Sequence, residues 1–108
     1  MIYEWRIYEI VPGKRRQLNE RFANHTLALF KKHGLKVVGF WESSVGGTSN
    51  MLYYMLAFDD MTQRESAWKS FREDQEWQKV SRESEKDGPL VAKITNMILA
   101  PTDYSPMK

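Results

Sequence analysis

Four segments of the chain place their side chains on two alternating surfaces, as β-strands do, and are rich in the β-branched and aromatic residues that strands favour. They cover residues 2–11, 35–45, 51–58 and 92–100. The third segment, MLYYMLAF, holds eight consecutive residues without a charge, so both of its faces are apolar. The second and third segments flank the turn-forming sequence GGTSN and predict an antiparallel hairpin.

Apolar residues recur at helical spacing between the first and second predicted strands. Within residues 14–33, Leu18, Phe22 and Leu29 fall on one helical face, and the following Gly34 suits a C-terminal cap. This spacing predicts one amphipathic helix whose apolar face covers a sheet.

A second helical region follows the hairpin. Thr62 and Glu65 have the capping-box spacing that marks a helix start, and the helical pattern weakens around residues 72–74 before it resumes up to Gly88. The predicted order is therefore β-α-β-β-α-β. This is the ferredoxin-like α+β arrangement, a four-stranded antiparallel sheet with both helices on one face.

The helices of this arrangement leave one sheet face uncovered, although the strands are apolar on both sides. Such a bare face would exceed the few hundred Å² of contiguous apolar surface usual on monomers, and its burial is worth about 25 cal/mol per Å². We therefore predict a homodimer in which two sheets pack through their helix-free faces and close a dimeric α/β barrel. The alternative cover is the irregular, polar tail of residues 101–108, which follows a single domain of residues 1–100.

Composition narrows the functional classes. The chain has 108 residues, of which 42% are hydrophobic and 28% charged, and this suits one globular domain. A net charge of +2, with lysines and arginines interspersed among acids, gives no basic block for binding nucleic acid. The absence of cysteine excludes disulfides and sulfur-held zinc, and no apolar run reaches the ~20 residues needed to span a bilayer. With no visible signal peptide, we expect a cytoplasmic protein.

His25 is the first candidate for chemistry, because it falls between Phe22 and Leu29 on the apolar face of the first helix. Seven residues after Leu18, it points within about 20° of that residue at the helical period. As an acid/base catalyst it would move a proton, and as a haem ligand it would take an axial position. The structural alternative is a core histidine that hydrogen-bonds a strand carbonyl, a tyrosine hydroxyl or a buried water.

Aromatic residues form the second candidate group. They can line a flat-walled pocket for a planar apolar ligand, or they can be ordinary core and dimer-interface filling. The ligand-binding candidates are Trp5, Phe22, Trp41, Tyr54, Trp68 and Trp77. Which of Tyr53 and Tyr54 faces the helices stays open at this point.

Charged residues interrupt two of the predicted strands. Glu4 and Arg6 lie in the first strand and Glu42 in the second. Arg6 can neutralise an anionic ligand or pair with Glu42 across the sheet, and we favour a salt bridge at the dimer interface. The two histidines stand eight residues apart and no cysteine is present, so no metal site is expected.

Four stretches of the chain, taken in order, resemble the NIPSNAP family of the dimeric α/β-barrel superfamily. They are YEWRIYEIVPGK, HTLALFKKHG, VVGFWESSVGGTSNMLYYMLAF and ESAWKSFREDQEWQKV, and the resemblance spans residues 2 to about 100. It implies the ferredoxin-like fold and dimerisation, which the periodicity predicts separately. It implies no catalytic residues, because the family's activity is largely unassigned. Superfamily relatives include cofactor-independent monooxygenases acting on phenolic or quinol-like substrates, haem-binding proteins and small-molecule isomerases, but a shared fold does not transfer these functions.

These observations lead to one functional hypothesis and two rivals. The first is a homodimer that binds a small aromatic or quinone-like molecule between the first helix and the sheet. There His25 would transfer a proton in monooxygenase-like or proton-transfer chemistry, and no cofactor is expected. The second is a haem-binding protein with His25 as axial ligand. The third is a non-catalytic dimeric interaction module, which predicts a core without a cavity.

Overall fold

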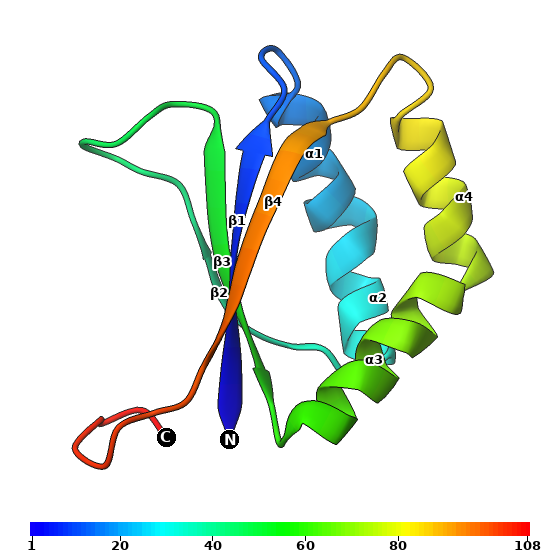
Figure 1. Cartoon of the computed structure of the whole chain (residues 1–108). Helices are drawn as coiled ribbons and strands as arrows, with labels where there is room; N and C mark the ends of the chain where they lie inside the picture. The colour runs from blue at the N-terminus through cyan, green and yellow to red at the C-terminus, as the bar shows by residue number, and fades with distance from the viewer.

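The computed structural model describes residues 1–108 and contains one antiparallel sheet of four strands. The central strand β1 (Ile2–Ile10) pairs with β3 (Met51–Phe58) on one side and with β4 (Val91–Leu99) on the other. β2 (Lys36–Trp41) pairs with β3, which gives the order β2-β3-β1-β4. All helices lie on one side of this sheet (Figure 1). The predicted ferredoxin-like fold is therefore confirmed.

Two helical regions connect the strands. The first runs without interruption through α1 (Arg15–Arg21), a π-helical turn η1 (Phe22–Thr26) and α2 (Leu27–Lys32). The second consists of α3 (Met61–Glu73) and α4 (Gln75–Ser84), which meet at a sharp corner in Figure 1. Both regions match the predicted helices to within a few residues at each end.

Aspartate side chains cap the N-termini of both helices in the second region. Asp74 separates α3 from α4 and accepts hydrogen bonds from two backbone N–H groups at the start of α4, at 2.7 and 3.3 Å, so the predicted break is confirmed. Asp60 accepts a hydrogen bond of 2.8 Å from the backbone N–H of Gln63 at the start of α3. The predicted capping box at Thr62 is wrong, because Thr62 already lies inside the helix that Asp60 caps.

The π-helical turn changes which residues of the first helix face the sheet. Within it the backbone N–H of Leu27 bonds to the carbonyl of Phe22, five residues back, and the Thr26 hydroxyl bonds to the Arg21 carbonyl at 3.2 Å. This wider turn holds one more residue than an α-helical turn. The buried apolar stripe therefore bypasses residue 25 and runs through Leu18, Phe22, Thr26, Leu29 and Phe30.

β2 is shorter than the predicted strand of residues 35–45. A bulge between Val37 and Gly39 shifts its register against β3, and the strand ends at Trp41. Beyond it, the Ser43 hydroxyl bonds to backbone carbonyls within the hairpin loop. The loop therefore begins earlier than the GGTSN sequence alone predicts.

The hydrophobic core lies between the sheet and the helices. Tyr54, Leu56 and Phe58 of β3 point towards the helices and are almost completely buried. The open question about the tyrosine pair is thereby answered: Tyr54 faces the helices, and Tyr53 lies half-buried on the opposite face.

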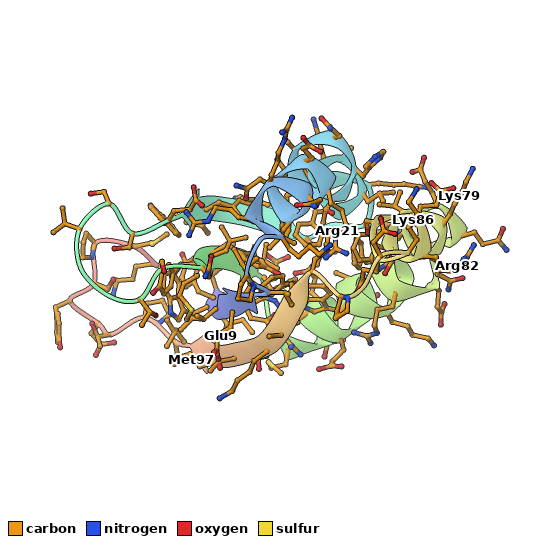
Figure 2. The ribbon with its side chains drawn as sticks, turned by 90° about the horizontal axis from the view of Figure 1, so that it is seen from above. Glu9, Arg21, Lys79, Arg82, Lys86 and Met97 are labelled. Atoms are coloured by element: carbon orange, nitrogen blue, oxygen red, sulfur yellow. The ribbon has the colours of Figure 1, made fainter.

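The helix-free face of the sheet remains open in the single chain. Trp5, Ile7 and Met55 are half-buried there, and Met97 of β4 is 47% exposed. Figure 2 shows Met97 on the side of the sheet away from α4. The C-terminal tail has no helix or strand and bends towards this side beyond the end of β4 (Figure 1). Tyr3 and Ala57 at that end of the face are buried, but most of the face stays open.

Candidate functional site

The structure separates His25 from the other predicted site residues. Its side chain is exposed, because the π-helical turn gives the inward position to Thr26. His25 instead lines a groove of about 350 Å³ between the first helix and α4. Two other lining residues, Arg21 and Lys86, are labelled in Figure 2. Of the ten lining residues only Val80 is hydrophobic. The predicted position of His25 on the buried stripe is therefore wrong.

The six aromatic candidates do not line one common pocket. Trp5 and Trp41 lie on the helix-free face, with ring centroids 5.8 Å apart. The helix side of the sheet holds the other four, which belong to the packed core or contact it: Phe22, Tyr54, Trp68 and Trp77. A small apolar groove of about 280 Å³ touches Phe22 and Trp41 where η1 passes over the end of β2. It contains neither His25 nor the remaining candidates.

Glu4 forms the centre of a polar network on the helix side of the sheet and is completely buried. Its carboxylate accepts hydrogen bonds from Arg64 (2.9 and 3.0 Å), Arg6 (2.9 Å), Trp68 (2.8 Å) and Asn96 (2.9 Å). Burial raises the pKa of Glu4, but the hydrogen bonds, those from Arg64 above all, and the charge of Arg6 outweigh burial and lower the pKa to about 2. The ionised carboxylate thus ties β1 to β4 and α3.

Arg6 lies beside this carboxylate, and its side chain is 12% exposed. Its Nε donates to the Tyr54 hydroxyl at 2.8 Å, and the Tyr54 hydroxyl shares a second hydrogen bond of 2.8 Å with the Tyr8 hydroxyl. The guanidinium lies over the Trp68 ring, with Cζ 4.6 Å from the ring centroid. The Tyr8 hydroxyl also interacts with this guanidinium and helps to raise its pKa, but Nη2 carries two N–H groups and so keeps a donor for a bound group.

The charges of this network do not balance locally. One carboxylate, that of Glu4, contacts the two guanidinium groups of Arg6 and Arg64, and the further partner of Arg64 is the exposed Glu65. Burial and the neighbouring Tyr8 raise the pKa of Tyr54 well above its ordinary value, although Arg6 opposes the shift. Tyr54 is therefore a neutral hydroxyl at physiological pH. Glu4, Arg6 and Arg64 together carry one net positive charge, which only the exposed Glu65 offsets.

An uncovered apolar strip runs along β4 next to this network. In the strand register Ile98 pairs with Glu4, Asn96 with Arg6, and Ile94 with Tyr8, so the three β4 side chains share the helix side of the sheet. The helices do not reach this edge strand: Ile94 is 49% and Ile98 39% exposed. Arg6 thus lies opposite Asn96, between the exposed apolar side chains of Ile94 and Ile98.

The predicted partner of Arg6 was wrong. Arg6 pairs with Glu4 on the helix side, whereas Glu42 pairs with Arg15 at 3.4 Å at the other edge of the sheet. The sequence carried one signal for the true arrangement. Glu4 and Arg6 stand two residues apart, which places them on the same face of a strand, and Tyr8 follows at the same interval. The contributions of Arg64 and Asn96 had no such signal, because they come from distant elements.

The fold and the strand order define a ferredoxin-like α+β domain of the kind found in dimeric α/β barrels. The model of the NIPSNAP family matches residues 3–106, and the chain belongs to that family. It is 30% identical to mouse protein NipSnap homolog 3B over 76 residues, which are 70% of this chain and 30% of the mouse protein.

Solved structures agree with this assignment. A NIPSNAP family protein of Agrobacterium tumefaciens superposes with a TM-score of 0.87 at 25% identity, covering 99% of this chain and 98% of that one. A variant of MhuD that holds two manganese protoporphyrin IX molecules per active site superposes with a TM-score of 0.63 at 10% identity, covering 94% of both chains, and shares the fold alone. No helix of this chain is both long and apolar enough to cross a bilayer.

Proposed function

We propose that this domain binds a small planar molecule with an anionic group, such as an aromatic carboxylate or a phenolate, on the helix side of β1 and β4. One observation carries the proposal: Arg6 is charged, mostly buried and has an unused Nη2 donor beside the open strip of Ile94 and Ile98. The guanidinium would hold the anionic group by charge-assisted hydrogen bonds, which are the stronger ones. The isoleucines would contact the ring.

The same contacts support binding more directly than catalysis. Tyr54 keeps its proton because its pKa is raised. Its neutral hydroxyl therefore orients Arg6 and does not act as a base. His25 lines a different groove. Replacing His25 by Ala is therefore expected to leave the affinity for an aromatic anion unchanged. A loss of affinity in that variant would instead support the hypothesis that His25 acts as an acid or base at the ligand site.

A paired titration tests the role of Arg6. We expect 2-naphthoate to bind more tightly than the uncharged 2-naphthamide in isothermal calorimetry, and Arg6→Gln to remove that preference. A hydrogen bond to a charged group is worth about 1.5–3 kcal/mol, which corresponds to about 10- to 150-fold in affinity. Arg15→Gln is the matched control, because Arg15 is half-exposed and pairs only with Glu42. Equal binding of the acid and the amide by the unmodified protein would contradict the proposal.

A second variant tests the same site without altering a buried residue, in case Arg6→Gln misfolds. Ile94→Glu places a carboxylate on the exposed strip without disturbing a buried residue. We expect it to weaken binding of 2-naphthoate and to leave thermal unfolding nearly unchanged. Unaltered affinity in this variant would show that the anion binds elsewhere.

The open sheet face supports a homodimer. Trp5, Ile7, Met55 and Met97 present a contiguous apolar surface that neither the helices nor the tail cover, and a second copy of the same face is the complementary partner. We expect a dimer mass in light scattering for the unmodified chain and a monomer mass for Met97→Glu. Tyr104→Glu in the exposed tail should remain dimeric. A monomer at every concentration for the unmodified chain would exclude this association.

The residues around His25 do not fit a haem. An axial histidine needs apolar walls against the porphyrin faces, but the groove has a single hydrophobic lining residue and three acids, Glu20, Glu83 and Asp87. We therefore expect haemin titration to give no Soret shift that depends on His25. Failure of every aromatic anion to bind would instead favour the non-catalytic interaction module, in which the dimer itself is the functional unit.

A further inference from the structure

A hydrogen-bonded chain of serine, histidine and aspartate lies where the end of α2 meets the junction between α3 and α4, away from the Arg6 network. Ser70 belongs to α3, His33 directly follows α2, and Asp74 stands between α3 and α4. Nδ1 of His33 lies 2.6 Å from the Ser70 hydroxyl, and Nε2 of the same ring lies 2.6 Å from Oδ2 of Asp74. A nucleophile, a base and a carboxylate that orients the base are thus in direct contact.

The charges fix the direction of these hydrogen bonds. Hydrogen bonds from His33 and then from Lys32 lower the pKa of Asp74 far below its ordinary value, so the carboxylate is ionised and can only accept. A neutral His33 therefore carries its proton on Nε2, where it donates to Asp74. Its Nδ1 then holds a lone pair that accepts the hydrogen of the Ser70 hydroxyl. This is the tautomer that a general base for Ser70 requires.

Ser70 is also accessible. It is exposed and lines an open groove of about 530 Å³, whereas the ring of His33 is mostly buried. Of the eight lining residues only Ala67 is hydrophobic, so the groove suits small polar substrates. Lys32 also lines the groove, and only one of the three donors on its ammonium group is used, in the contact of 3.0 Å with Asp74. It can donate to an oxyanion that forms near Ser70.

We propose that Ser70, His33 and Asp74 form a nucleophilic site that hydrolyses small polar esters. The Ser70 oxygen attacks the ester carbonyl carbon while its proton passes to Nδ1 of His33. The bond from carbon to the alkoxy oxygen then breaks, and His33 returns the proton to the leaving alcohol. Water attacks the acyl-serine with the same base and releases the acid and free Ser70. His33 and Ser70 touch the reacting atoms, and Asp74 is a positioning residue.

The natural absence of cysteine allows a single-site test. Ser70→Cys introduces one thiol next to His33, and Ser66→Cys introduces a matched thiol one turn earlier on α3, in the same groove. A base in contact with a thiol increases its thiolate fraction and its reactivity. We expect iodoacetamide to alkylate Ser70→Cys at least about 10-fold faster than Ser66→Cys at pH 7, and the difference to vanish when His33→Gln is added. Equal rates in the two single variants would overturn the proposal.

Turnover provides the second test. We expect the unmodified protein to release p-nitrophenol from p-nitrophenyl acetate, and Ser70→Ala to slow the release by about 100-fold, within the range typical of an activated nucleophile and its base. Ser44→Ala, in the exposed hairpin loop outside this groove, should leave the rate unchanged. Mass spectrometry should find the transient acetyl group on Ser70. Hydrolysis that survives Ser70→Ala, or the absence of hydrolysis in the unmodified protein, would mean that these hydrogen bonds only fasten α2 to the corner of α3 and α4.

Discussion

Replacing the buried Glu4 by glutamine should destabilise the fold strongly. The substitution keeps the shape of the side chain and removes the one negative charge that Arg6 and Arg64 share. Removing one partner of a buried ion pair costs about 3–5 kcal/mol, because the remaining charge is left uncompensated. That is a large part of the 5–15 kcal/mol by which domains are usually stable. We therefore expect Glu4→Gln to lower the free energy of unfolding by about 3 kcal/mol or more at pH 7.

The pH dependence of this loss follows from the pKa of Glu4. The pKa falls from 4.5 for an unperturbed carboxyl to about 2 in the folded chain. A lowered pKa stabilises the folded state above pH 4.5, and the stabilisation disappears as pH falls through 2. At 1.36 kcal/mol per pKa unit the contribution is about 3.5 kcal/mol at pH 7 and about 1.5 kcal/mol at pH 3. The gap between the unmodified protein and Glu4→Gln should therefore narrow by about 2 kcal/mol between these pH values.

Urea denaturation, monitored by tryptophan fluorescence, measures this difference in the free energy of unfolding. Both proteins are compared at the same concentration, because the stability of a dimer depends on protein concentration. Taking the difference between the two proteins cancels the other titrating groups, Asp74 among them. Glu42→Gln is the control, since the Glu42 pair with Arg15 is half-exposed and worth about 0–1 kcal/mol at most. A Glu4→Gln loss as small as that of the control, or a gap that stays constant down to pH 3, would refute the account of the network.

Three smaller perturbations test other parts of the structure. Tyr54→Phe should cost about 1–3 kcal/mol in urea denaturation, because it leaves two buried hydrogen-bonding partners unmatched; a neutral result would mean that water replaces the hydroxyl. Asp60→Ala should cost about 0.5–2 kcal/mol in the same assay through loss of the cap on Gln63, while Asp60→Asn should restore most of it. Gly39→Ala would place a Cβ 2.8 Å from the ring of Trp41, so we expect the ring to turn outwards and the fluorescence to shift to the red, and an unchanged spectrum would contradict this geometry.

The fold was predictable because its signals are local. Alternating side chains, the turn cluster between the second and third strands and the helical spacing of Leu18, Phe22 and Leu29 each report on neighbouring residues. The failures arose where one position depends on a distant or unusual contact. The cap at Asp60 displaced the predicted one at Thr62, and the hairpin loop begins directly after Trp41, so β2 is shorter than predicted.

The candidate site was less predictable than the fold. The interval between Glu4 and Arg6 predicts a shared face, but the side chains that complete the network come from α3 and β4, and nothing in the sequence specifies their approach. His25 was misplaced by a single property of the backbone. The run of Asn24, His25 and Thr26 contains weak helix formers, yet that weakness does not indicate a π-helical turn.

The π-helical turn also gives the first helix one spare residue. Excising the exposed Ala23 should let η1 close into ordinary α-helix while the segments before and after it keep their present sides towards the sheet. Deleting one residue from α2 would instead rotate the following residues of the helix by about 100° around its axis. Relatives aligned with this chain can therefore differ by one residue within the helix, and a gap placed there need not be moved to a neighbouring loop.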